Sequence, residues 1–208
     1  MAVSTALDAV RFGSSEVAAL YLGSDSVWTA NAPGMVLLTD YTITHAGTSA
    51  TLTNGQVTFT AVTSLSLNGV FTAGFDNYVI SIRHVGSSYD GVRMRLRAAG
   101  SDASGSDYTR QELQANGSSV SANRLGSLNI APTFSTSSTQ RSGTTVMMYG
   151  PALAQPTASR TIEALGESGG YIYDIAWTHS LSTAYDGVTI FPASANITGA
   201  LQVYGVRS

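Results

Sequence analysis

One short stretch of the 208-residue chain matches the pattern of a catalytic nucleophile. Residues 166–170 read Gly-Glu-Ser-Gly-Gly, the form Gly-x-Ser-x-Gly in which a serine stands on a sharp turn between a strand and a helix, with its hydroxyl raised over an oxyanion hole. The next residues, Tyr171-Ile172-Tyr173, favour a strand rather than a helix. We therefore predict that Ser168 is a turn residue, that the chain has no catalytic residue, and that it is not an enzyme.

Residues that usually hold metals or cofactors are scattered along the chain. There is no cysteine, which excludes disulfides, thiolate metal sites and cysteine nucleophiles. His45, His84 and His179 lie far apart and lack the spacing of metal ligands. Asp102 and Asp107 share one loop without the alternating acidic pattern of a calcium loop, so calcium there stays an alternative. The acidic residues contain no marked pair for glycoside hydrolysis. We predict no metal and no cofactor.

Three arginines alternate with apolar residues and could bind an anion. Arg93, Arg95 and Arg97 fall on one face of a predicted strand, and Val92 and Met94 begin its apolar face. Guanidinium groups bind phosphate and carboxylate well, so the stripe could contact an anionic polymer such as phosphate-bearing cell-wall material. The favoured alternative is a solvated face, or arginines paired with acids of a neighbouring subunit.

A second stripe is aromatic. Tyr171, Tyr173, Ile175, Trp177 and His179 share one face of another predicted strand. Aromatic rings stack on sugars, but a sandwich core or a subunit interface requires the same residue types. We favour the core or the interface.

Composition limits the partners. Charged residues are 11% of the chain, and the net charge is -3 with all ten basic residues arginine. This balance does not indicate nucleic acid or an anionic membrane as a partner. No apolar run approaches the roughly 20 residues that span a bilayer, and Met1–Asp8 lacks the basic start and apolar core of a secretory signal. We predict a soluble protein that neither binds nucleic acid nor inserts into a membrane.

The elements that position these residues are strands. From Met35 onward, short strands recur between turn signals, as in sandwiches and barrels. Residues Thr51–Phe59 are predicted to form a hairpin with Asn54-Gly55 at its tip. The stretch Ser64–Gly100 is predicted to form strand, corner, strand, hairpin and strand, with Asp90-Gly91 at the hairpin. The strand Arg160–Leu165 is predicted to pair with Tyr171–Ser180. Residues 118–142 are polar and poor in pattern. The predicted fold is all-β, a jelly-roll-like antiparallel β-sandwich over residues 33–208.

Residues 1–32 are predicted to form a separate attachment segment. We interpret Val17–Leu22 as a strand and Ser26–Thr29 as its return, which makes a β-hairpin too small to be stable alone. The candidate docking residues of this hairpin are apolar: Val17, Leu20, Leu22, Val27 and Trp28. The alternative is that the hairpin completes the sandwich.

Several short sequence segments of the chain resemble β-sandwich structural proteins of tailed bacteriophages. They are Ser66–Phe71, Phe75–Tyr78, Arg93–Gly100 with Tyr108, Tyr185–Ile190 and Ile197–Arg207. The segments Val10–Gly13 and Tyr21–Trp28 resemble the short attachment segment of phage tail proteins. Residues 118–142 match no part of this pattern.

The resemblance implies a virion structural protein of minor-tail or tail-fibre type, displayed on the particle and serving as a receptor-binding subunit in host attachment. It implies a homotrimer that contacts other tail or capsid proteins and assembles in the host cytoplasm. Host cell-surface polysaccharide is a further possible partner. One alternative is a capsid decoration or head-fibre protein. The alternative from another class is a carbohydrate-binding or carbohydrate-active module.

Overall fold

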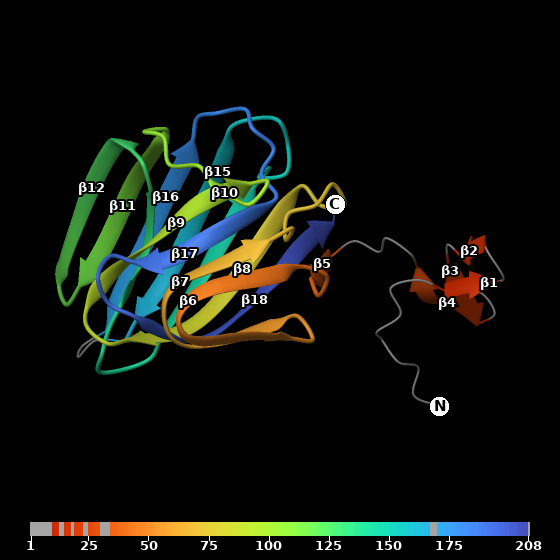
Figure 1. The fold of residues 1–208 in the computed structure, drawn as a ribbon, viewed down its shortest axis with the longest axis horizontal. Helices are drawn as coiled ribbons and strands as arrows, with labels where there is room; N and C mark the ends of the chain where they lie inside the picture. The colour runs from red at the N-terminus through yellow and green to blue at the C-terminus, as the bar shows by residue number, and fades with distance from the viewer. Residues whose placement is uncertain are drawn as a thin grey trace. The chain divides into compact units, whose positions relative to one another are not determined.

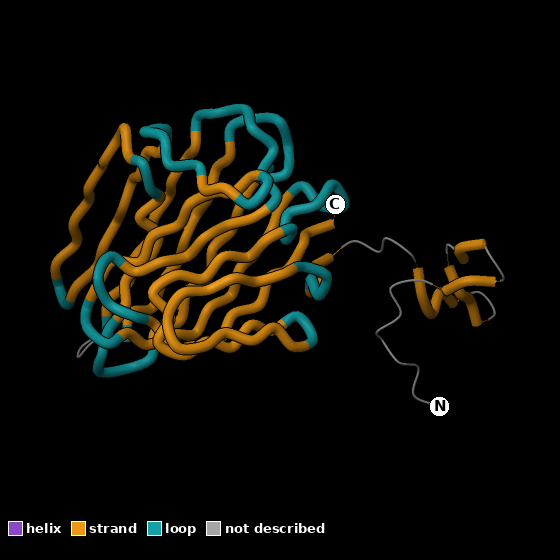
Figure 2. The backbone as a smooth tube through the Cα atoms, in the orientation of Figure 1, coloured by secondary structure: helices purple, strands orange, loops and turns teal. Residues whose placement is uncertain are grey.

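The computed structural model of the chain describes residues 10–12, 15–17, 19–22, 25–29, 34–166 and 170–207. These residues form strands and connecting turns, as Figure 2 shows, and no helix. The described residues accordingly include no helix long and apolar enough to cross a membrane. The chain divides into two compact units, one up to Gly34 and the other from Met35 to Val206. This division lies two residues beyond the predicted boundary between residues 32 and 33.

The N-terminal unit contains two separate two-stranded antiparallel sheets. In one, β1 (Val10–Phe12) pairs with β2 (Ser15–Val17); in the other, β3 (Ala19–Leu22) pairs with β4 (Asp25–Thr29). The predicted single strand over Val17–Leu22 is wrong, because its residues are divided between β2 and β3. The reason is that Val10–Phe12 is itself extended and pairs with Ser15–Val17, which places Val17 in a different sheet from Leu20.

The larger unit is built from fourteen strands in one hydrogen-bonded antiparallel sheet that folds over on itself into two layers (Figure 1). The strands are β5 (Gly34–Leu37), β6 (Thr42–Thr53), β7 (Gln56–Asn68), β8 (Asn77–Gly86), β9 (Asp90–Ala98), β10 (Ser101–Asp102), β11 (Tyr108–Asn116), β12 (Ser119–Leu128), β13 (Ala131–Thr136), β14 (Ser142–Tyr149), β15 (Thr157–Leu165), β16 (Tyr171–His179), β17 (Gly187–Pro192) and β18 (Ile197–Arg207).

We call the two layers sheet I and sheet II. Sheet I contains β9 and β17, with β10 and β13 beside β9. Sheet II has the order β12-β11-β16-β15-β14-β8-β18, with β5 beside β18. Strand β7 belongs to both, because its Leu65–Leu67 part pairs with β17 and its Val57–Val62 part pairs with β18. The predicted all-β, jelly-roll-like antiparallel sandwich is confirmed.

The β6–β7 hairpin makes the fold-over possible. Its register shifts between Ala46 and Gly47, where Gly47 has φ +107° and a Cβ would lie 2.3 Å from the carbonyl oxygen of Ala61. Ala61 has a φ of 46°, in the left-handed region that non-glycine residues rarely adopt. A bulge of this kind bends a strand pair and increases its twist, so one hairpin can continue from sheet I into sheet II.

The core lies between the layers. The inner face of sheet I is apolar and almost completely buried through Leu65, Leu67, Val92, Met94, Leu96, Val188 and Ile190. From sheet II, Ile80, Val146, Met148 and Trp177 belong to the same cluster. At about 25 cal/mol per Å² of apolar surface, burial of this kind is the dominant favourable term in folding.

Two local predictions are confirmed and one is wrong. Asn54 and Gly55 form the predicted hairpin tip, both with positive φ, and β15 pairs with β16 as predicted. The predicted hairpin at Asp90-Gly91 does not form. Strand β8 lies in sheet II while β9 lies in sheet I, and the Asp90 carboxylate instead accepts hydrogen bonds from the backbone N–H groups of Ser194 (2.6 Å) and Ala195 (2.8 Å).

The pattern-poor stretch 118–142 contains two strands. Strand β12 is the last strand of sheet II and nearly all of it is exposed, so it has no buried face that would produce alternation. Strand β13 pairs with β9 and buries Ala131, Thr133, Phe134 and Thr136. Its polar buried residues hide the strand from an analysis based on hydropathy.

Candidate functional site

The predicted arginine stripe lies on the outer face of sheet I. Along β9 the burial alternates as predicted, with Val92, Met94 and Leu96 buried and the arginines between them half-buried. The three arginines nevertheless have different surroundings, because the strands that pair with β9 change along its length.

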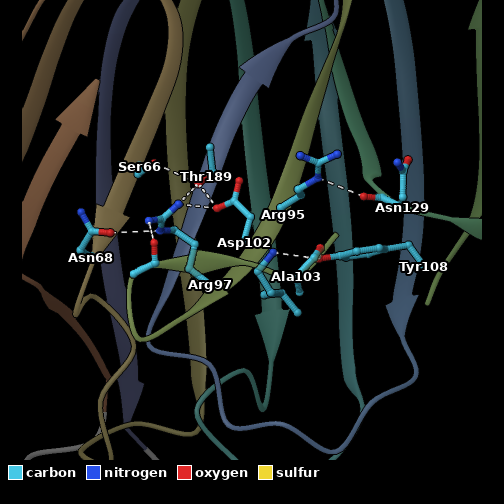
Figure 3. Close-up of polar contacts among 11 residues, drawn as sticks. Ser66, Asn68, Arg95, Arg97, Asp102, Ala103, Tyr108, Asn129 and Thr189 are labelled. Carbon is cyan, nitrogen blue, oxygen red and sulfur yellow. Dashed lines mark hydrogen bonds and ion pairs between the residues drawn. The ribbon is translucent and has the colours of Figure 1, made fainter. Parts of the chain in front are cut away.

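Arg97 is the centre of a polar network that joins four segments (Figure 3). Its Nε donates to Asn68 Oδ1 (3.0 Å) on β7, and one terminal nitrogen donates to Thr189 Oγ1 (2.8 Å) on β17. The same nitrogen forms an ion pair with Asp102, and the other donates to the carbonyl oxygen of Gly100. Thr189 in turn donates to Asp102 Oδ1 (2.7 Å). Arg97 is therefore engaged within the chain rather than presented to a partner.

Arg95 is also held in place. Its Nε donates to the carbonyl oxygen of Asn129 (3.0 Å), and its guanidinium carbon lies 5.2 Å from the centroid of the Phe191 ring. A cation over an aromatic face is attracted by the ring's negative face. Arg93 differs from both, because it is one of the residues that line a cleft bordered by β13, β11 and β12.

Tyr108 ties the 101–107 loop to the core, also shown in Figure 3. Its hydroxyl donates to the carbonyl oxygen of Ala103 (3.1 Å) and accepts from the N–H of Leu96 (2.9 Å). Asp102, one of the two candidate calcium ligands, is committed to Arg97 and Thr189. Within the part of the chain that the structure describes, no group of three or more histidine, aspartate or glutamate side chains could hold a metal ion.

The three histidines do not form one site. His45 is exposed, whereas His84 and His179 are completely buried. Nδ1 of His179 lies 3.1 Å from the Tyr185 hydroxyl. Nε2 of His84 lies 3.1 Å from Thr144 Oγ1 and 3.7 Å from Oε1 of Glu163.

The His84–Glu163 contact is a buried polar cluster rather than an ion pair. Burial raises the pKa of Glu163 to about 8 and lowers the pKa of His84 to about 4, so both groups are neutral at pH 7. The N–H of Ser135 donates to Glu163 Oε2 (2.8 Å). Neutral partners at this cluster avoid the cost of a buried charge.

The aromatic stripe belongs to the core. Tyr173, Ile175, Trp177 and His179 are each buried to 96% or more, and Tyr171 is half-buried beside them. This confirms the core interpretation for the face of β16 and leaves no aromatic platform there for a sugar.

A cleft of about 330 Å³ opens between the sheets near β11 and β12. Its walls are mostly apolar, with Leu128, Pro132, Phe134 and Ile175 among them. Its charged groups are Arg93 from sheet I and the pair Arg110 and Glu112 from β11. Arg110 and Glu112 were not predicted as site residues from the sequence. Both lie on the same face of β11 as the buried Tyr108. Charged residues on the core-facing side of a strand are the signal that could have identified them.

The outer face of sheet II carries an exposed apolar patch, which we call the outer apolar patch: Leu113, Val120, Ile162 and Ile172, with exposed fractions of 51%, 76%, 43% and 61%. The register places Leu113 and Ile162 on either side of Asp174, and Ala115 between Val120 and Ile172. Asp174 is neutralised by Arg160 through hydrogen bonds of 2.9 Å and 2.6 Å. The patch therefore spans four neighbouring strands, β12, β11, β16 and β15.

The remaining predicted site residues are placed by their backbone or lie outside the described residues. Among the candidate docking residues, Leu20 is the register partner of Trp28, while Leu22 pairs with Asp25 and Val17 with Val10. Val27 lies within β4. Ser168 lies outside the described residues.

Neither a protein-family model nor a curated protein matches the chain. Among the solved structures that match is lectin II from Ulex europaeus, with 9% sequence identity, covering 81% of this chain and 94% of that chain at a TM-score of 0.20. This likeness carries no argument about function.

Proposed function

We propose that the protein is a structural subunit of a tailed-bacteriophage virion, of minor-tail or tail-fibre type, assembled in the host cytoplasm and displayed on the particle for host attachment. The resemblance of its sequence phrases to such proteins supports this, as does an all-β body whose most conspicuous polar groups hold the fold together. The same sandwich would serve at a tail or a capsid position, and imaging of intact particles distinguishes the two.

The observation that carries the proposal is the division into two units. The N-terminal unit consists of two-stranded sheets of three to five residues per strand, and isolated sheets of this size are marginally stable in water. Its sequence is nonetheless rich in apolar residues, including Leu20, Leu22 and Trp28. A small unit of apolar sequence, separate from the sandwich, fits a segment that docks into another virion protein.

A chain beginning at Asn31 tests this division. We expect it to remain soluble and to melt cooperatively, because every strand of the sandwich is retained, yet to be absent from purified particles. Aggregation, or a much lower melting temperature than that of the full chain, would show that the N-terminal segment belongs to the core instead.

The outer apolar patch supports the homotrimer that is part of the proposal. Contiguous exposed apolar surface on a soluble protein usually marks a protein–protein contact. The neighbouring edge strand β12 is ten residues long and contains no proline and one charged residue, Arg124, so it has few of the residues that usually protect an edge from pairing. Copies of this chain are the occupant that we propose.

The oligomer is tested by the mass of the full chain in solution. We expect a trimer for the native protein and dissociation for Ile172→Glu, which places a charge in the patch, while the melting temperature of the subunit stays unchanged. Thr178→Glu, on the same face of β16 but outside the patch, is the matched control. A native protein that is monomeric both in solution and on the particle contradicts the proposal.

The proposal also includes the absence of hydrolytic activity. Ser168→Ala should leave folding and particle infectivity unchanged. An esterase or polysaccharide-degrading activity that disappears in this variant would identify an enzyme.

A further inference from the structure

The cleft between the sheets has the size and the wall of a small-molecule site. Its volume of about 330 Å³ lies at the lower end of the range typical of ligand pockets. Ile175 and Phe134 in its wall are each 2% exposed, and they come from opposite layers. Because the walls belong to strands rather than to mobile loops, the cavity is preformed.

The charges in the cleft favour an anion. Arg93 and Arg110 contribute two positive charges and Glu112 one negative charge, which leaves one excess positive charge. The two arginines come from different sheets, β9 and β11, so an anion between them would also bridge the layers. A single negative charge on the ligand would balance the site, whereas a second would be repelled by Glu112.

Arg110 is oriented by an ion pair with Glu112, but one of its hydrogen-bond donors has no acceptor among the described residues. Its NH1 lies 3.0 Å from Glu112 Oε2, and the side chains are only 12% and 15% exposed. Its Nε is buried and has no hydrogen-bond partner among the described residues. A buried donor without an acceptor costs about 1–3 kcal/mol. An acceptor oxygen that enters the cleft would remove this cost, and a carboxylate would do so most strongly.

We propose that this cleft binds a small monoanionic carboxylate ligand, with the carboxylate between Arg93 and Arg110 and an apolar body or ring face against Phe134 and Ile175. Two kinds of carboxylate fit this chemistry, a sugar acid and an aliphatic acid. The inference rests on the cleft alone and holds whether or not the protein is part of a virion.

Titration of the isotope-labelled full chain, followed by NMR, tests the proposal. The probes are glucuronate and hexanoate, with glucose and hexanol as uncharged counterparts. We expect one or both carboxylates to shift the resonances of cleft residues with a dissociation constant in the millimolar range or below, and the uncharged compounds to cause no such shift. Preference for glucuronate identifies a sugar acid, and preference for hexanoate an aliphatic acid.

Three variants complete the test. Arg93→Gln should weaken carboxylate binding by roughly tenfold or more, as expected for the loss of a charged hydrogen bond. The double variant Arg110→Gln/Glu112→Gln should do the same while leaving no unpaired charge in the cleft. Arg160→Gln, which removes an arginine from the outer face of sheet II, should bind like the native chain. Absence of carboxylate binding, equal binding of the uncharged compounds, or unchanged binding by Arg93→Gln and by the double variant would overturn the proposal.

Discussion

The inner faces of sheet I and of one strand of sheet II, β15, differ in polarity, although both layers contribute apolar side chains to the core. Sheet I is apolar inside, where Met94, Leu96 and Ile190 are 0–1% exposed, and polar outside, where Arg97 and Asp102 form their network. In β15 of sheet II the arrangement is reversed. This strand buries polar residues and exposes Ile162 and Ala164 on its outer face.

The buried polar residues of β15 are Thr157, Ser159, Thr161 and Glu163. The three hydroxyls have no hydrogen-bond partner among the described residues. Burial of an unpaired polar group costs free energy, so β15 contributes less to stability through its inner face than the apolar strands of sheet I. The difference teaches that sheet I has the apolar interior and polar exterior of a surface that faces water, whereas β15 buries hydroxyl groups and exposes Ile162.

The largest effect should come from the inner face of sheet I. Leu96→Ala removes a completely buried side chain and should lower the free energy of unfolding by about 2–5 kcal/mol. Leu113→Ala, on the exposed outer face of sheet II, is the control and should change the stability of the chain by less than about 0.5 kcal/mol. Denaturant unfolding at a protein concentration at which the chain is monomeric measures both. Equal effects would remove the contrast between the sheets.

The inner face of sheet II should respond to pH through Glu163. Its pKa of about 8 in the folded chain lies above the ordinary value of 4.5, so the folded state holds the proton more tightly. The stabilisation that the protonated Glu163 carboxyl gives to the folded state is complete at pH values below its ordinary pKa of 4.5. It is lost as the pH rises through the folded-state pKa of about 8. Glu163→Gln mimics the protonated form and should be more stable than the native chain by on the order of 3 kcal/mol at pH 7.

Thermal unfolding between pH 6.5 and 9 measures the Glu163 effect. The low pKa of His84 makes that residue destabilising only as the pH falls below about 6.5, so it does not contribute in this range. Asp40→Asn, at an exposed acid, should reproduce the native pH dependence. A Glu163→Gln variant with the same slope as the native chain would show that Glu163 ionises freely in the fold.

The two outer faces can be compared through their ion pairs. Arg97→Gln removes the cation of a pair whose side chains are only 13% and 26% exposed, and it should destabilise the chain by about 1–2 kcal/mol because Asp102 keeps its partly buried charge. Arg160→Gln removes the equivalent member of an exposed pair on sheet II, and should have a smaller effect because solvent and salt screen an exposed ion pair. Chemical denaturation of the two variants ranks them, and the reverse order would contradict this comparison.

The smallest effect is expected at a buried hydroxyl of sheet II. Thr161→Val replaces an unpaired hydroxyl that is 0% exposed by a methyl group, and should leave stability unchanged or raise it by about 1 kcal/mol. Thr178→Val on the exposed face of β16 should be neutral. A clear loss of stability in Thr161→Val, measured by thermal unfolding, would mean that the hydroxyl makes a stabilising contact.

The sequence alone determined the fold class and many of its strands. Alternation with period two identified β9, and the positive φ required by Asn54-Gly55 identified the hairpin tip, because both signals depend on neighbouring residues only. The same alternation placed Arg93, Arg95 and Arg97 on one face and assigned the aromatic face of β16 to the core.

Only the tertiary structure decided which strands are neighbours and what each polar group meets. Asp90-Gly91 looked like a hairpin, but Asp90 binds the backbone of residues 194 and 195, which are distant in sequence. Arg97 likewise contacts Asn68 and Thr189, which are distant in sequence. The cleft is also lined by residues from different sheets, Arg93 and Arg110. These contacts depend on strand order across the two layers, whereas periodicity reports only which face of a strand is buried.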